Sequence, residues 1–291
     1  MAPPALRYHA PTTVTEAVDV LAALGDDAAI LAGGQSLMPL LITRQLTPGH
    51  VVDINGIASL DYVRLEPAGV RLGAVARQAD VEHDRQVIGV LPLLRQALCL
   101  VAVPAVRSRG TIVGSLVGGL PSAELRAALA LAGGSVQVAG VEGTRTVPAE
   151  VFLADGVGAR DLVVSALIRR PPPGTGTAVV EVSRRRRVGR AIVGVAAAVT
   201  LTAQRRIGRA RVAYMGIAVT PPTLDLTETA IDSDATRVEW IAAGRRAREQ
   251  IHPVGDRYAT AAYRRHLVDV LTTRALRAAT AHALAEPNDA R

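Results

Sequence analysis

Apolar residues recur at two spacings along the chain, and these spacings predict a mixture of helices and strands. Residues 13–24 carry apolar side chains every three or four positions, which predicts an amphipathic helix capped by Thr13 or Thr15 and stopped by Gly25. Runs such as Ala28–Leu31 are too short for helices and predict buried strands. Further strands are expected at His50–Ile54, Gly69–Ala74, Ser135–Ala139, Asp161–Ile168, Ala178–Ser183, Ile192–Ala203 and Arg209–Ile217, and further helices at Gln78–His83, Leu91–Ala105, Leu125–Ala132, Arg237–Gln250 and Tyr258–Leu284.

The segment Pro171–Gly176, PPPGTG, is the clearest linker in the chain. Well before it, a strand–helix–strand unit of the βαβ type ends near Gly56. After it, three strands predict a small antiparallel sheet, and the chain then becomes helical. Three parts are therefore expected, at residues 1–56, 57–175 and 176–291.

The stretch Ala28–Leu41, AAILAGGQSLMPLL, leads from a strand through two glycines into an apolar run that begins with Ser36. Gly33 and Gly34 tolerate positive φ, so the chain can reverse tightly there. Ser36 is a favoured N-cap residue, and the residues after it predict one or two helical turns. Backbone N–H groups beside a helix N-terminus form a place for an anion, although such turns are also common as plain connections.

A second glycine-punctuated turn follows at Arg109–Leu116, RGTIVGSL, with hydroxyl groups at Thr111 and Ser115. Two such turns can hold a diphosphate from both sides, through main-chain amides and short hydroxyl donors. The two turns are therefore candidates for a diphosphate clamp.

Composition narrows the function further. Hydrophobic residues make up 49% of the chain, which argues against disorder, and all 33 basic residues are arginine. Without lysine, neither a Schiff base nor a phosphate loop of the Gly-Lys-Ser/Thr type is possible. Nucleic acid is not an expected partner despite the net charge of +7, because the arginines are dispersed and aromatic residues make up only 2%. Arginine suits protein interfaces and phosphate contacts better.

Cys99 is the only cysteine, so the chain can form neither an intrachain disulfide nor an iron–sulfur cluster of its own. It stands in an apolar run, where a buried thiol is expected. The six histidines show no metal-ligand spacing. No signal sequence and no membrane span are apparent, and the longest uncharged apolar run, Ala191–Ala203, is too short for a bilayer. A cytoplasmic protein is expected.

Taken together, AGGQSLMPLL and RGTIVGSLVGGLPSAEL resemble the FAD-binding medium subunit of the molybdenum hydroxylases, the family that includes carbon monoxide dehydrogenase and xanthine dehydrogenase. The family pattern is approximately AGG-(H/Q/T)-S-L-(I/M)-P followed by R-G-T-I-G-G-(N/S)-L, and the resemblance covers almost the whole chain. It implies an α+β fold, with a two-part FAD-binding domain of the PCMH/vanillyl-alcohol-oxidase-like type followed by a small antiparallel sheet with helices.

The resemblance also implies a function and partners. In the family, electrons leave a molybdenum centre in a large subunit, cross two iron–sulfur clusters in a small 2Fe-2S subunit and reach the flavin, which passes them to an external acceptor. This chain is then an oxidoreductase subunit that binds FAD, with the large molybdenum-cofactor subunit and the small 2Fe-2S subunit as partners in a dimer of heterotrimers. With a single cysteine, the chain cannot perform the substrate half of the reaction alone.

The cofactor-binding residues that the resemblance implies lie in both turns and at three other places. Gln35 stands where histidine is common in the family, and since an amide cannot form a covalent flavin link, non-covalent binding is expected. The implied residues are Ala32, Gly33, Gly34, Gln35, Ser36 and Leu37 in the first turn, Thr111, Gly114 and Ser115 in the second, and Glu124, Ile168 and Arg186 elsewhere.

Two of the other places have an ordinary structural alternative. Glu124 matches a family position where an acidic residue contacts the nucleotide part of the cofactor, as a carboxylate does when it accepts from a ribose hydroxyl. It could equally complement a helix dipole as a first-turn acid. Any one of the arginines Arg184–Arg187 could meet the diphosphate, or the run could be an exposed charged patch.

The sequence departs from the family pattern at three places. Val113 replaces a glycine of the second motif, and a β-branched residue resists positive φ and crowds a phosphate. Leu120 replaces a common aspartate, and Gly189-Arg190 stands where relatives often have Gly-Asp. These changes leave open the alternative of a non-catalytic assembly subunit with a degenerate flavin site. A stand-alone FAD enzyme is a second alternative. The substrate and the terminal electron acceptor do not follow from this sequence.

Overall fold

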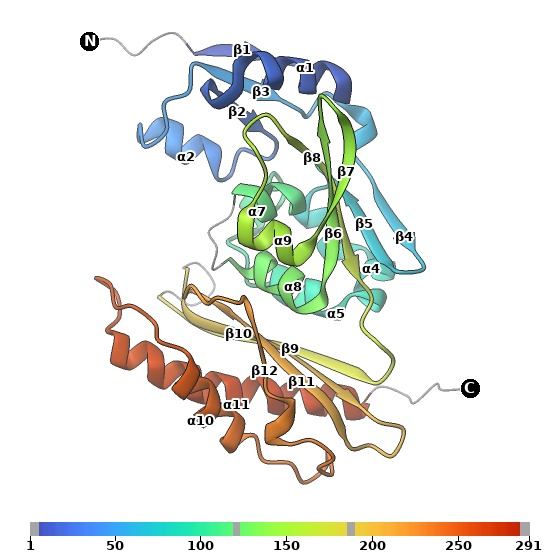
Figure 1. The fold of residues 1–291 in the computed structure, drawn as a ribbon, viewed down its shortest axis with the longest axis vertical. Coiled ribbons are helices and arrows are strands. Elements are labelled where there is room, and N and C mark those ends of the chain that lie inside the picture. The colour runs from blue at the N-terminus through green and yellow to red at the C-terminus, as the bar shows by residue number, and fades with distance from the viewer. Residues whose placement is uncertain (1–5, 119–122, 185–189, 286–291) are drawn as a thin grey trace. The chain divides into compact units, whose positions relative to one another are not determined.

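A computed structural model describes residues 6–118, 123–184 and 190–285. The chain divides into two compact units (Figure 1). The first unit comprises Met1–Val90, Val103–Leu120 and Gly133–Arg169, and the second comprises Leu91–Ala102, Pro121–Ala132 and Arg170–Arg291.

The first unit contains two sheets. One is a parallel three-stranded sheet in the order β1-β3-β2, and the other is an antiparallel five-stranded sheet in the order β4-β5-β8-β6-β7. Its strands are β1 (Arg7–His9), β2 (Ala28–Leu31), β3 (His50–Asp53), β4 (Val63–Glu66), β5 (Gly69–Gly73), β6 (Gly134–Gly140), β7 (Gly143–Pro148) and β8 (Leu162–Arg169). Its helices are α1 (Val14–Leu24), α2 (Leu37–Ile42), α3 (Gln78–His83), α4 (Arg85–Val90), α6 (Pro104–Arg107), α7 (Ile112–Gly118) and α9 (Ala149–Asp155).

The helix α1 shows how the local sequence sets an element. Thr13 caps it, and the side chain of Glu16 accepts from the Thr13 N–H in return, which is a complete capping box. Gly25 ends the helix with φ +55°, a conformation that suits glycine. The buried face, formed by Ala17, Val18 and Leu21, has the predicted helical spacing and contacts the sheets of this unit.

The second unit is an antiparallel sheet in the order β12-β11-β10-β9, with the long C-terminal helix packed against it and the preceding helix packed on that helix (Figure 1). Gly176 of β9 permits the closest approach, because a Cβ there would collide with the backbone of Ala279 and Ala283. The strands are β9 (Thr175–Ser183), β10 (Ala191–Leu201), β11 (Ile207–Met215) and β12 (Thr223–Asp225). The helices are α5 (Pro92–Leu98), α8 (Glu124–Ala132), α10 (Ile241–Gln250) and α11 (Ala261–Ala285).

The α+β fold class predicted from the sequence is confirmed, and the C-terminal part has the expected antiparallel sheet and helices. That sheet has four strands rather than the expected three, because the short strand β12 also pairs with β11. The single helix expected at Leu91–Ala105 is wrong. The chain forms α5 and α6 there, separated by Ala102 at φ +44° and with Pro104 at the start of α6, where its ring is tolerated. The expectation of a buried Cys99 is also wrong, since this residue is exposed just after α5. The three-part division with a boundary at residue 56 stays a prediction.

Across the part of the chain described here, no helix combines the length and the apolar character that crossing a bilayer requires.

Candidate functional site

The first glycine turn connects β2 to α2. Gly34 has φ +72°, as its position in a tight reversal requires, and the side-chain amide of Gln35 donates to the carbonyl of Gly33 at 3.2 Å. Ser36 occupies the N-cap position, but its side chain makes no capping hydrogen bond. Within residues 6–118, the N–H groups of Gly34, Gln35 and Ser36 have no intramolecular acceptor, so they are available to a ligand.

The second motif forms the start of a helix. The N–H of Gly114 donates to the hydroxyl oxygen of Thr111 at 3.0 Å, so Thr111 caps α7. The side-chain amide of Gln78 donates to the Ser115 hydroxyl at 2.7 Å and to the Thr111 carbonyl at 3.3 Å. Because the carbonyl can only accept, Gln78 presents its NH₂ group there, and Ser115 keeps its own proton for donation.

The two turns are in direct contact at Gly33. A Cβ added to Gly33 would lie 2.5 Å from the carbonyl oxygen of Arg109, 2.8 Å from the Cα of Gly110 and 3.0 Å from the Thr111 nitrogen. No side chain fits in that space. The glycine of the first motif is therefore required for the close approach of the second.

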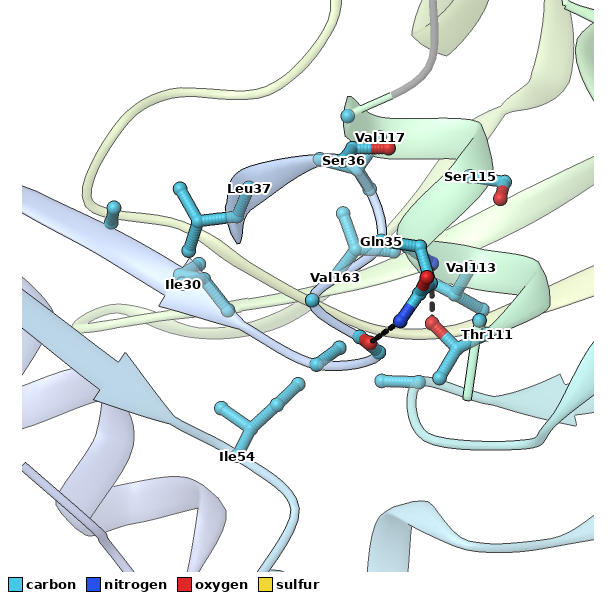
Figure 2. A pocket seen from close by; sticks show the side chains of 18 of the residues that line it. Ile30, Gln35, Ser36, Leu37, Ile54, Thr111, Val113, Ser115, Val117 and Val163 are labelled. Atoms are coloured by element: carbon cyan, nitrogen blue, oxygen red, sulfur yellow. Dashed lines mark hydrogen bonds between the residues drawn. The ribbon is translucent and has the colours of Figure 1, made fainter. Parts of the chain in front are cut away.

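Both turns line one cavity of about 260 Å³ in the first unit (Figure 2). Figure 2 shows the start of α7 and the first turn facing this space, with Ile30, Leu37 and Ile54 around the rest of it. The complete lining is Ala29, Ile30, Ala32, Gly33, Gly34, Gln35, Ser36, Leu37, Leu40, Leu46, Ile54, Ala74, Gly110, Thr111, Val113, Gly114, Ser115, Val117, Gly118, Val157, Asp161, Leu162 and Val163.

The lining fits part of a dinucleotide cofactor. Aliphatic side chains provide apolar contact for a flat ring, while backbone amides and the hydroxyls of Ser36, Thr111 and Ser115 provide donors for a diphosphate. Pockets for small-molecule ligands usually measure about 300–1,000 Å³, so a cavity of about 260 Å³ holds only one portion of a molecule as long as FAD.

One cavity residue is negatively charged and was not expected from the sequence. Asp161 accepts two hydrogen bonds from the Arg145 guanidinium, at 2.6 and 3.1 Å, and these bonds hold the pKa of its carboxyl below the ordinary value. Arg145 thus neutralises the carboxylate beside the proposed anion site. In the sequence Asp161 stood only at the start of a predicted strand, so nothing distinguished it.

The structure brings together nine of the twelve predicted residues, namely those of the two turns. Ile168 is buried in β8 and is not part of the lining, although Leu162 and Val163 of the same strand are. Glu124 begins α8 in the second unit, where burial raises the pKa of its carboxyl against the opposing charge of Arg190. Arg186, Leu120 and Gly189 lie outside the described residues.

Of the two arguments against valine at position 113, resistance to positive φ and crowding of a phosphate, the first is wrong. Val113 lies in the first turn of α7 and does not have positive φ, so a β-branched residue is not strained there. Its side chain is buried, with 2% of its surface exposed, and it also contributes to the cavity wall (Figure 2). Its effect on a phosphate stays a prediction.

Comparison with known proteins agrees with this geometry. Residues 4–170 match the family described as FAD binding domain in molybdopterin dehydrogenase, and residues 178–279 match the CO dehydrogenase flavoprotein C-terminal domain. The 6-hydroxypseudooxynicotine dehydrogenase complex subunit alpha of Paenarthrobacter nicotinovorans is 34% identical, and the match covers 95% of each chain. The carbon monoxide dehydrogenase medium chain of Afipia carboxidovorans is 30% identical, over 97% of this chain and 99% of that one.

A solved structure of carbon monoxide dehydrogenase from Hydrogenophaga pseudoflava, which lacks the Mo-pyranopterin moiety of its molybdenum cofactor, superposes with a TM-score of 0.87 at 32% identity. That match covers 97% of this chain and 99% of the other. The resemblance seen in the two glycine motifs is thereby confirmed over both units. The chain belongs to the family of FAD-binding subunits of the molybdenum hydroxylases.

Proposed function

We propose that this chain is the flavoprotein subunit of a molybdenum hydroxylase, and that it holds FAD non-covalently between its two glycine turns. The observation that carries the proposal is the direct contact of Gly33 with Arg109 and Gly110 at the edge of one shared cavity. Bound FAD would supply the redox chemistry, by taking up electrons from a partner and releasing them to an external acceptor.

The residues of this chain then bind and orient the cofactor. The N–H groups of Gly34, Gln35 and Ser36 would donate to the diphosphate from one side, and the hydroxyls of Thr111 and Ser115 from the other. Ala32, Gly33, Leu37 and Gly114 would bring the backbone close. The side-chain amide of Gln35 donates to its own turn, which supports non-covalent binding.

Three further residues complete the proposed site. Glu124 would accept from the nucleotide part, Ile168 would contact the flavin through its main chain, and Arg186 would meet the diphosphate. Residues 1–56 and 57–175 would form the two halves of the FAD-binding region, and residues 176–291 the C-terminal part.

The proposed partners are a large molybdenum-cofactor subunit and a small 2Fe-2S subunit, assembled as a dimer of heterotrimers in the cytoplasm. The names of the relatives support partners in general, since they describe a complex subunit and medium chains. The described residues include no group of three or more His, Cys, Asp or Glu side chains that could hold a metal ion. The metal centres would therefore come from the partners.

FAD titration of the purified chain tests the cofactor assignment. We expect a yellow protein whose flavin is released on acid or heat denaturation, and an apoprotein that rebinds FAD. Gly33→Ala should weaken FAD by tenfold or more, because the added methyl group must force the two turns apart. Gly89→Ala is the matched control, since a Cβ at Gly89 meets nothing within 4 Å and alanine favours a helix over glycine.

A colourless wild-type protein that ignores added FAD would favour the degenerate assembly subunit and would overturn the proposal. If the Gly33→Ala and Gly89→Ala variants bound FAD with equal affinity, FAD would not bind between the two turns, although the chain would still be an FAD-binding protein.

A further inference from the structure

The guanidinium of Arg77 connects the two glycine turns without lining the cavity. Its Nη1 donates to the carbonyl oxygen of Arg109 at 2.7 Å, and its Nη2 donates to the Oδ1 of Asn55 at 2.7 Å. Asn55 in turn donates through Nδ2 to the carbonyl oxygen of Ala32 at 2.8 Å. Three hydrogen bonds thus join the residue before Gly33 to the residue before Gly110.

The orientation of Asn55 is fixed by its neighbours. Arg77 can only donate and the Ala32 carbonyl can only accept, so the amide of Asn55 has one possible orientation. The carboxylate of Asp53 accepts from both the backbone N–H and the Nδ2 of Asn55, at 2.9 and 2.5 Å. The hydroxyl of Tyr8 donates to the other oxygen of Asp53 at 2.6 Å.

These hydrogen bonds also favour the ionised form of Asp53. Partial burial of Asp53 opposes its ionisation, but the hydrogen bonds from Tyr8 and Asn55 outweigh that effect and hold the pKa of Asp53 below its ordinary value. The carboxylate therefore stays charged at neutral pH and keeps Asn55 in place. A network in which each polar atom has a partner restrains its members more than isolated bonds would.

We infer that Arg77 is a positioning residue, which sets the spacing of the two glycine turns and so the shape of the diphosphate cradle. The inference rests on the proposed function. A planar guanidinium directs two donors in a fixed geometry, so it holds the Arg109 carbonyl and Asn55 at a defined separation.

The decisive variant is Arg77→Leu, which removes both donors and keeps much of the side-chain volume. We expect it to weaken FAD by roughly tenfold to a hundredfold, as the loss of charge-assisted hydrogen bonds does elsewhere. ADP, which shares the diphosphate, should lose affinity by the same factor. Arg77→Lys should lie between the wild type and Arg77→Leu, because one ammonium group cannot reproduce the fork.

Arg71→Leu is the matched control for loss of stability. Arg71 is another half-buried arginine of the first unit, with hydrogen bonds of 2.6 and 3.1 Å to Glu66 within the β4–β5 hairpin, and it is not part of the cavity lining. Both leucine variants should lower the melting temperature of the apoprotein, but only Arg77→Leu should change the affinity for FAD and ADP. Asn55→Ala should weaken FAD to a similar degree, and combining it with Arg77→Leu should add little.

The inference is overturned if Arg77→Leu keeps wild-type FAD affinity, or loses no more of it than Arg71→Leu does. Additive effects of Asn55→Ala and Arg77→Leu would also contradict it, since the two residues would then act separately. If the wild-type chain bound neither FAD nor ADP, the proposed function itself would be wrong. The wild-type titration therefore tests the function, and the comparison of the variants with the wild type tests the role of Arg77.

Discussion

Val113 lies where the sequence motif and the structure lead to opposite expectations for one substitution. If this residue were the weak point of the motif, Val113→Gly would tighten FAD. In the structure it is a buried residue of α7 without positive φ, so glycine brings no conformational relief. We instead expect Val113→Gly to destabilise the protein by about 2–4 kcal/mol, through the lost apolar contact and the cost of glycine in a helix.

The measurement is denaturant unfolding of the apoprotein together with FAD titration, with Val113→Ala as the control. Val113→Ala retains helix propensity and should account for most of the stability loss, and neither variant should bind FAD more tightly than the wild type. Tighter binding by Val113→Gly would show that the valine crowds the phosphate.

Single residues also show which parts of the site a sequence can and cannot predict. The glycines of both motifs carry their own signal, because close approach and tight reversal demand glycine. Arg77, Gln78 and Asp161 carry none. Their roles depend on partners many positions away, such as Asn55 for Arg77 and Ser115 for Gln78, and no local pattern encodes those contacts.

At the scale of elements, β9 contains a carboxyl group whose ionisation should affect stability. Burial, together with the neighbouring carboxylate of Glu124, raises the pKa of Glu181 from 4.5 to about 7, while a hydrogen bond with Ser183 opposes the shift. The Oε2 of Glu181 is buried and finds no hydrogen-bond partner within the described residues. Ionisation of this group is therefore unfavourable in the folded state.

The consequence is a defined pH dependence. Because the pKa of Glu181 is higher in the folded state than in the unfolded state, protonation of this carboxyl group stabilises the fold. This contribution is complete below pH 4.5 and is lost as pH rises through about 7. Glu181→Gln should therefore be more stable than the wild type at pH 8, by about 1–2 kcal/mol after allowance for solvent around a half-buried group, and similar to it at pH 4.5.

Melting temperatures of both proteins between pH 4.5 and 8 test this prediction. Glu249→Gln, on the exposed side of α10, serves as the control and should follow the wild-type curve. Parallel curves for Glu181→Gln and the wild type would contradict the prediction.

Elements with strong local signals were predicted most accurately. Strand β2 and helix α3 have the expected bounds. Helix α1 is capped by Thr13, one of its two predicted caps, and ends at Gly25 as predicted. The three-residue strand β1 was missed, because its pairing with β3 rather than its own pattern makes it a strand. The helical periodicity over Leu91–Ala105 did not predict the interruption between α5 and α6, because the spacing of apolar residues gives no information on the positive φ of Ala102.

At the scale of the whole molecule, the second unit draws on separate parts of the chain. Helices α5 and α8 belong with the C-terminal sheet, although both precede the proline-rich linker. Helix α5 contacts β9, and helix α8 contacts β10 and β11. Both helices bury apolar residues, so burial of these residues, and not their order in the sequence, decides to which unit each helix belongs. The proline-rich linker separates two segments of the sequence, but it does not show which helices before it pack against the sheet after it.

The chemistry of the whole chain requires partners, and this gives the last prediction. A single cysteine cannot supply the thiolates that an iron–sulfur cluster needs, so in the proposed complex a partner chain would hold the cluster. Affinity purification of the tagged chain from its native host should therefore yield iron and molybdenum that co-elute with it on gel filtration, at a mass far above 30.4 kDa. The same tagged chain produced in a host without the partner genes is the control, and it should contain flavin alone. Flavin-bearing protein from the native host without either metal would instead favour a stand-alone FAD enzyme.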